Sequence, residues 1–102
     1  MNGYLLTFYI EQNRMHNHQS LSNWLLDLAR DTGLRGATIV PASQGFGATH
    51  RLHAAHFFEL ADQPLMVLMA LNAEEKDQIM QKIRQESLHI FYTLVEAKFG
   101  LS

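Results

Sequence analysis

Apolar and polar residues in the first third of the chain change pattern twice. Residues 4–10 are aromatic, aliphatic or β-branched without a breaker, which favours a buried strand. A polar stretch from Glu11 to Ser20 follows, and we interpret it as a loop. Apolar residues then return at the spacing of one helix face, at Leu21, Trp24, Leu25, Leu28 and Ala29. Ser20 is the predicted N-cap of this helix, and Gly33 followed by Leu34 predicts its end.

Two further strands are predicted in the middle of the chain, on either side of an irregular segment. Residues 36–40 (Gly-Ala-Thr-Ile-Val) restart the strand pattern, and Pro41 marks a sheet edge or a bend. Residues 48–63 follow no period and are interpreted as a loop. Residues 65–71 are all apolar and come directly after Pro64, which predicts a strand that enters the sheet.

A second helix and a last strand complete the chain. Asn72 and Glu75 have capping-box spacing, and apolar residues on one helical face follow them. Residues 88–95 (Leu-His-Ile-Phe-Tyr-Thr-Leu-Val) predict the last strand, and residues 96–102 a short tail. The predicted order is therefore β-α-β-β-α-β.

This order predicts one domain of the α+β class over residues 1–102. Helices between strands require right-handed crossovers, and the two halves pack as a ferredoxin-like βαββαβ sandwich. Its antiparallel sheet has both helices on one face, and the other face needs a separate cover. A domain this small would otherwise expose a large apolar patch, so we expect oligomerisation to close that face.

Composition narrows the class of function. Lys and Arg number 8 against 10 Asp and Glu, so the basic excess of a nucleic-acid binder is missing. The absence of cysteine excludes disulfides, thiolate metal ligands and a cysteine nucleophile. The apolar run at 65–71 is far shorter than the ~20 residues needed to cross a bilayer, and the first residues carry no basic region of a signal peptide. We therefore expect a cytoplasmic protein without direct membrane insertion. Catalytic fingerprints are also missing, so we do not expect an enzyme.

Histidine is unusually frequent, with 6 in 102 residues. Five of them fall in the two irregular segments, at His16, His18, His50, His53 and His56. Imidazole is a common ligand of zinc and copper, so His50 and His53 are the candidate metal ligands. They share a face only if their segment is helical. We favour the alternative that these histidines are polar loop residues, because the His-Glu-x-x-His pattern of a zinc helix is absent.

Residues 33–47 (Gly-Leu-Arg-Gly-Ala-Thr-Ile-Val-Pro-Ala-Ser-Gln-Gly-Phe-Gly) resemble the first helix end and second strand of PII signalling proteins. In that family a Gly-Phe-Gly opens a long mobile loop, the T-loop. Residues 89–92 (His-Ile-Phe-Tyr) resemble the Lys-Ile-Phe-Val of its last strand. The similarity is closer to uncharacterised bacterial PII-like proteins, through Gly45-Phe46-Gly47, Arg51-Leu52-His53 and Leu60 to Pro64. It covers nearly the whole chain.

The resemblance implies a homotrimer that binds a small ligand in clefts between subunits. Gly36, Ala37 and Thr38 take the positions where PII proteins hold an adenine base, and Gly47 lies near the phosphates. His89, in the last predicted strand, replaces a phosphate-binding lysine. Arg51 is the candidate anion partner, because its guanidinium can clamp a phosphate or carboxylate. The predicted ligand-binding residues are Gly36, Ala37, Thr38, Gly45, Phe46, Gly47, Arg51 and His89.

Departures from the PII pattern bear on the ligand and the mechanism. The chain has no glycine between Gly47 and Gly100, so the glycine-rich phosphate loop is missing. Thr49 replaces the glutamine that helps PII proteins hold magnesium and 2-oxoglutarate. The resemblance thus implies an adenine-nucleotide sensor in which residues 48–63 act as the T-loop toward a transporter, channel or enzyme. Two alternatives stay open: a histidine-based metal-binding trimer resembling CutA-type proteins, and an interaction module without a small ligand.

Overall fold

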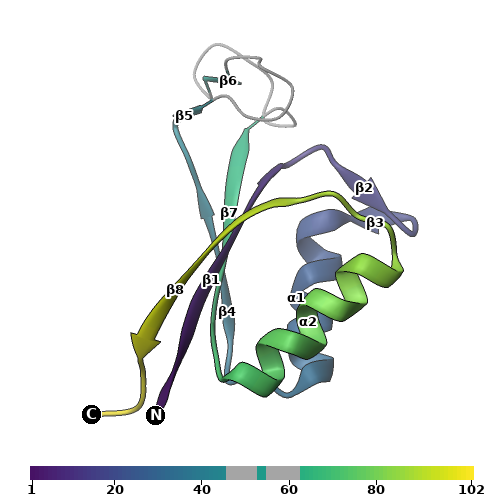
Figure 1. The fold of residues 1–102 in the computed structure, drawn as a ribbon. Coiled ribbons are helices and arrows are strands. Elements are labelled where there is room, and N and C mark those ends of the chain that lie inside the picture. Colours follow the sequence, from purple (N-terminus) through teal and green to yellow (C-terminus); the bar gives the residue numbers. More distant parts are fainter. Residues whose placement is uncertain (46–52, 55–62) are drawn as a thin grey trace.

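The computed structural model describes residues 1–45, 53–54 and 63–102, and it places two helices on one side of an antiparallel sheet (Figure 1). The four strands of the sheet are ordered β4-β7-β1-β8. Their bounds are Asn2–Glu11 for β1, Ala37–Pro41 for β4, Pro64–Leu71 for β7 and Phe91–Lys98 for β8. The helices are α1, Leu21–Thr32, and α2, Ala73–Gln85. The predicted ferredoxin-like arrangement is confirmed.

Two short strand pairs lie outside the main sheet. One joins β2, Met15–His16, to β3, Gln19–Ser20, and the other joins β5, Gln44–Gly45, to β6, His53–Ala54. The first pair corrects the interpretation of residues 11–20 as a loop. The second lies at the described borders of the 48–63 segment, most of which falls outside the described residues.

The caps predicted for α1 hold both of its ends. The Ser20 hydroxyl accepts a hydrogen bond from the backbone N–H of Asn23 at 3.2 Å. At the other end, Gly33 adopts a φ of 94°, a left-handed conformation that costs glycine little. Leu34 then donates its N–H to the Ala29 carbonyl at 3.1 Å, which satisfies the end of the helix.

The predicted capping box of α2 is also formed. The Asn72 side chain accepts from the Glu75 N–H at 2.8 Å, and the Glu75 carboxylate accepts from the Asn72 N–H at 2.9 Å. Two N–H groups that the helix cannot satisfy internally therefore gain partners. This fixes where the chain leaves β7 and turns onto the same side of the sheet as α1.

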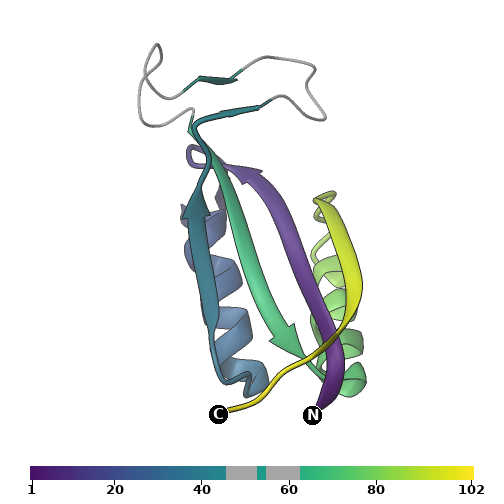
Figure 2. The same ribbon diagram turned by 90° about the vertical axis from the view of Figure 1, so that its left-hand side faces the viewer.

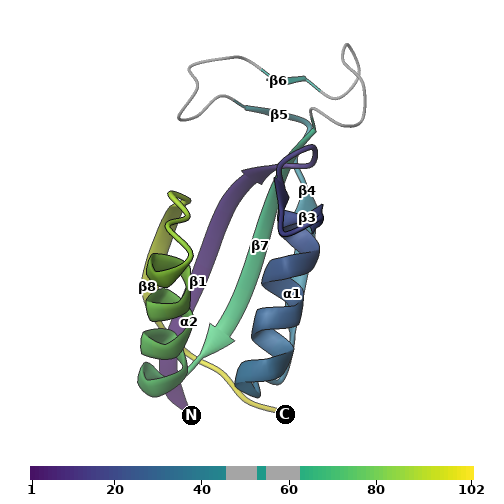
Figure 3. The same cartoon turned by 90° about the vertical axis from the view of Figure 1, so that its right-hand side faces the viewer.

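The core lies between the sheet and the helices (Figure 3). Alternate residues of the two central strands point under the helices and are buried, as the two-residue period of a strand requires. The side chains with no exposed surface are Leu6, Phe8, Val67, Met69 and Leu71 from the sheet and Leu21, Leu25 and Ile79 from the helices. We call this side of the sheet the covered face.

No described helix lies over the opposite side, which we call the open face (Figure 2). In each strand, the residues that alternate with those of the covered face point toward this open face. The strand register aligns Tyr9 with Phe91, and Leu5 with Val95, on this side. Phe91 is 66% exposed, Val95 55% and Tyr9 39%. The sequence-based expectation of one covered and one uncovered face is met.

The last strand begins later than predicted. Residues 88–90 precede β8 and do not pair in the sheet. The reason is the turn after α2: Ser87 has a φ of 55°, and the Leu88 N–H bonds to the carbonyl of Ile83. Pairing then continues to Lys98, opposite Asn2, so the strand takes up the first part of the predicted tail.

Candidate functional site

The residues predicted to hold an adenine base lie at one edge of the sheet. Gly36 directly precedes β4, and Ala37 and Thr38 are its first residues. Gly36 and Thr38 are exposed, whereas Ala37 points toward the covered face and packs against the core. Thr38 aligns with Leu68 on the open face. Of these three residues, Gly36 and Thr38 are therefore the accessible ones.

His89 lies at the opposite edge. It is exposed and stands in the connection between α2 and β8, not within the strand as predicted. The strand order separates β8 from β4 by two central strands, as Figure 2 shows. One chain alone therefore does not bring His89 next to Thr38 or Gly36.

The remaining predicted ligand residues fall at or beyond the described segments. Gly45 is described through its backbone, which pairs with His53 in the β5–β6 ladder. Phe46, Gly47 and Arg51 lie outside the described residues, so their predicted roles stay predictions.

A groove surrounds His89 between α2 and β8. It has a volume of about 440 Å³ and is lined by Phe8, Met80, Ile83, Arg84, Leu88, His89, Ile90, Phe91 and Tyr92. Phe8 is fully buried, and its ring lies 6.4 Å from that of Tyr92, which is 44% exposed. The lining is mostly apolar, with Arg84 and His89 as nitrogen donors. Such a groove suits a flat or apolar group that carries a negative charge.

Arg84 and Tyr92 were not predicted as site residues. Arg84 lies in the last turn of α2, where a basic residue also favours the helix dipole, so its position gave no separate signal. Tyr92 is the last residue of the segment that resembles the PII last strand. Both reach the groove because α2 packs beside β8, an arrangement that depends on the fold.

The segment that carries His89 is tied to the β2–β3 hairpin. His16 donates from Nε2 to Glu86 Oε1 at 2.9 Å, and Arg14 Nη1 donates to the His89 carbonyl at 3.3 Å. Hydrogen bonds from His16 and Asn17, together with the charge of Lys82, lower the pKa of the Glu86 carboxyl. The carboxylate is therefore held ionised, and its bonds restrain the chain three residues before His89.

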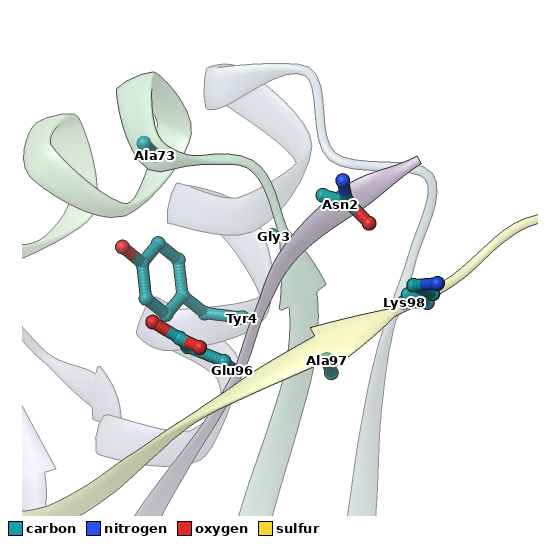
Figure 4. A pocket seen from close by; sticks show the side chains of 7 residues that line it. All are labelled: Asn2, Gly3, Tyr4, Ala73, Glu96, Ala97 and Lys98. Atoms are coloured by element: carbon teal, nitrogen blue, oxygen red, sulfur yellow. The ribbon is translucent and has the colours of Figure 1, made fainter.

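A second hollow, of about 590 Å³, lies at the far end of β1 and β8 (Figure 4). The Tyr4 ring and the Glu96 carboxylate lie beside each other in it. Lys76 Nζ stands 5.4 Å from the Tyr4 ring centroid, and the pKa of Lys76 is raised chiefly by its hydrogen bond to Asp77. Lys98 completes a lining of mixed charge, and none of its residues was predicted as a ligand.

The candidate metal ligands are not tested by the structure. His50 lies outside the described residues, and His53 is described through its backbone alone. Among the residues that the structure describes, no three His, Asp or Glu side chains gather into a group able to hold a metal ion. Neither α1 nor α2 is long and apolar enough to cross a membrane.

Comparison with known proteins identifies the family. Residues 3–98 match the DUF190 family, described as Uncharacterized ACR. A UPF0166 protein of Aquifex aeolicus (strain VF5) is 28% identical over 72 residues, which are 71% of this chain and 69% of that protein.

Solved structures of PII-like proteins share the fold. CPII from Thiomonas intermedia K12, a nitrogen regulatory PII-like protein bound to ADP, AMP and bicarbonate, matches with a TM-score of 0.75 at 18% identity, over 99% of this chain and 91% of that one. A PII-like signaling protein from Thermus thermophilus matches with a TM-score of 0.71 at 18% identity, over 95% and 88%. The predicted resemblance is thus confirmed, and the chain belongs to the DUF190 family and has the fold of the PII-like proteins.

Proposed function

We propose that this protein is a PII-like sensor: a homotrimer that binds an adenine nucleotide between its subunits and signals through residues 48–63. The observation that carries the proposal is the division of the predicted ligand residues between two opposite sheet edges. Gly36 and Thr38 offer one half of a site at β4, and His89 offers the other half beside β8. Two halves on opposite edges meet when the β4 edge of one copy adjoins the β8 edge of the next.

The open face supports association of copies. In β1 and β8, the residues on that side are apolar or uncharged from Leu5 through Tyr9 and from Phe91 through Ala97. Burying a large apolar side chain stabilises by roughly 1.5–3 kcal/mol, so a face of this kind favours association. A cyclic assembly repeats the same contact around a ring, which yields equivalent clefts.

The groove at His89 supports a phosphate-bearing ligand with an apolar part. CPII, with the same fold, is bound to ADP, AMP and bicarbonate in its solved structure. In this chain the glycine-rich phosphate loop is missing, and His89 and Arg84 are the side chains of the groove that carry nitrogen donors. Fewer phosphate contacts favour a mono- or diphosphate, and we propose AMP or ADP as the ligand class.

The signal would be a change in the 48–63 segment when the nucleotide binds beside it. Such a change requires that the nucleotide bind one arrangement of the segment more tightly than another. The partner that reads this difference would be a protein such as a transporter, channel or enzyme. No catalytic step is assigned to the chain.

Isothermal titration calorimetry with ADP and with AMP, each with and without bicarbonate, tests the proposal. We expect saturable binding of one of them, and a loss of affinity of about tenfold in His89→Ala, because a charge-assisted hydrogen bond is removed. His18→Asn is the matched control, since His18 is exposed on the β2–β3 hairpin and does not line the groove. Absence of binding, or equal affinity in His89→Ala and wild type, would contradict the proposal.

A further inference from the structure

The short hairpin at residues 14–20, which we call the clamp hairpin, contacts the segment 86–90 that carries His89. The two lie beside each other at the end of α2 (Figure 1). The Glu86 carboxylate accepts from His16 Nε2 at 2.9 Å and from Asn17 Nδ2 at 3.4 Å. Arg14 Nη1 donates to the carbonyl of His89 itself at 3.3 Å. The bonds therefore hold the segment at its first residue and at His89.

The clamp hairpin is itself fixed to the rest of the fold. Its strands pair Met15 with Ser20 and His16 with Gln19. Asn17 and His18 form the turn with φ of 51° and 66°, the two left-handed positions that suit a two-residue hairpin. The Leu21 N–H, at the start of α1, bonds to the Arg14 carbonyl at 2.8 Å. A hairpin anchored in this way can transmit its position to the segment that it touches.

His16 connects the clamp to the core. Its ring meets the Trp24 ring edge-on, with centroids 4.9 Å apart and planes at 85°. Trp24 is 9% exposed and belongs to the core cluster, so it limits how far the imidazole can move. The position of Glu86 thus depends on a histidine held between a buried aromatic ring and a carboxylate.

Protonation of an imidazole beside a carboxylate strengthens the bond between them. An imidazole exchanges its proton roughly between pH 5 and 8, and a protonated ring makes a stronger, charge-assisted bond to a carboxylate. The groups that face His16 are Glu86, at the end of α2, and the uncharged Trp24 from α1. Lys82 Nζ lies 3.6 Å from the other oxygen of Glu86. On the hairpin itself, Arg14 contacts the His89 carbonyl, and His18 is exposed at the turn.

The lowered pKa of Glu86 keeps its carboxylate ionised over the pH range in which an imidazole ordinarily gains a proton. A fall in pH through the histidine range therefore strengthens the bond. The bond is lost only when the pH falls below the ordinary glutamate range and Glu86 itself takes up a proton.

We propose that the clamp hairpin positions His89 in its groove, and that protonation of His16 tightens this hold. The segment 86–90 would then carry the change at His16 to the groove. The positioning part concerns the structure alone, whereas its effect on affinity rests on the proposed nucleotide-binding function.

Nuclear magnetic resonance tests the positioning directly. In a His89→Gln background, which removes the imidazole carried by the segment itself, the His16 imidazole and the backbone amides of Ser87 and Leu88 are followed from about pH 5 to pH 8. We expect the two amide resonances to move with the midpoint of His16. In Glu86→Gln, which keeps the shape and removes the charge, this response is expected to disappear. His18→Asn, at the turn of the same hairpin, should leave it unchanged.

The proposed clamp is wrong if the resonances of the two amides do not change at the midpoint of His16. It is also wrong if they still change at that midpoint in Glu86→Gln. A second variant, His16→Gln, tests the same contact in case Glu86→Gln does not fold. It should also abolish the change in the Ser87 and Leu88 amide resonances between about pH 5 and pH 8. Circular dichroism of each variant confirms that the fold persists.

ADP titrations separate the clamp from the proposed function. With His89 in place, we expect Glu86→Gln and Arg14→Gln to bind ADP several-fold more weakly than wild type. The deficit of Glu86→Gln should be larger near pH 6 than near pH 8, at either end of the histidine range. If wild type binds no ADP, the proposed function fails and the resonance experiment still decides the clamp. If ADP binds and the resonances show no coupling, the clamp fails and the function stands.

Discussion

The covered and open faces of the sheet are built from alternate residues of the same strands, yet within the described residues the helices cover only one of them. Phe8 and Leu6 are fully buried beneath the helices, while Phe91, on the neighbouring strand, keeps 66% of its surface. An antiparallel sheet with one solvated face ordinarily carries polar residues there. Here both faces are largely apolar. The apolar residues on the open face, where polar ones are usual, favour its burial against another surface. The neighbouring copies proposed above would supply that surface.

The largest expected effect is on the covered face. Phe8→Ala should lower the free energy of unfolding by about 3–5 kcal/mol, because it leaves a cavity under α2. Urea unfolding followed by circular dichroism measures this loss. Phe91→Ala on the open face is the matched comparison, and it should keep the secondary structure while weakening association. If Phe8→Ala and Phe91→Ala lower the free energy of unfolding equally at low protein concentration, the covered face contributes no more to folding of the single chain than the open face does.

A charge placed on the open face should act on assembly and not on the fold. Val95 is 55% exposed in the single chain, so Val95→Lys is compatible with folding of one copy. Between copies, however, an unpaired buried ammonium costs several kcal/mol, and the assembly should dissociate. Sedimentation velocity distinguishes the two states. Gln81→Lys, on the exposed side of α2, is the control; a Val95→Lys protein that sediments like wild type would contradict the role of this face.

Gly3 lies at the start of β1, where the backbone of β7 comes close to it. A Cβ at this position would collide with the carbonyl oxygen of Leu71 and come within 2.7 Å of the Phe99 ring. We expect Gly3→Ala to cost roughly 1–3 kcal/mol, because backbone must shift to admit the methyl group. Differential scanning calorimetry gives the change. Gly100→Ala, whose Cβ would meet nothing within 4 Å, should be neutral, and similar losses in both variants would refute the collision.

The smallest expected effect concerns Glu86, which lies away from both faces. The pKa of Glu86 in the folded protein is below its ordinary value, so the stability that its carboxylate contributes is present above the ordinary glutamate range and is lost as the pH falls through the lowered pKa. The melting temperature of Glu86→Gln should therefore lie slightly below that of wild type near pH 7, and the two should converge in acid, where Glu86 is protonated in the folded protein as well. A difference that persists unchanged in acid would show that the carboxylate charge is not the cause.

The helices were predictable because their signals are local. Ser20, Gly33 and the pair Asn72 and Glu75 each act within a few residues of a helix end, and the structure uses all of them. The predicted start of β8 was wrong because the turn before it has no sequence signal. Residues 88–95 are mostly aliphatic or aromatic, which is typical of a strand. The left-handed turn that keeps residues 88–90 out of the sheet is formed by Ser87 and not by a glycine, which would have predicted it.

The candidate site was less predictable, because its contacts join distant parts of the chain. His16 and Glu86 are 70 residues apart, and no spacing rule connects them. Arg84 and Tyr92 line the groove because α2 packs beside β8. The resemblance to PII proteins named residues at both sheet edges, and only the strand order revealed that Gly36 and His89 stand on opposite ones.

A complementation experiment on the ADP site tests whether that site joins two copies of the chain. Gly36→Phe blocks the β4 half, and His89→Ala removes the β8 half; each variant alone should bind ADP poorly while sedimenting like wild type. The two are mixed in equal amounts, unfolded and refolded together, and titrated with ADP. If each site joins two copies, roughly a quarter of the sites receive two intact halves and regain wild-type affinity, because each half is drawn at random. If the refolded mixture binds no more ADP than either variant alone, the site does not lie between copies.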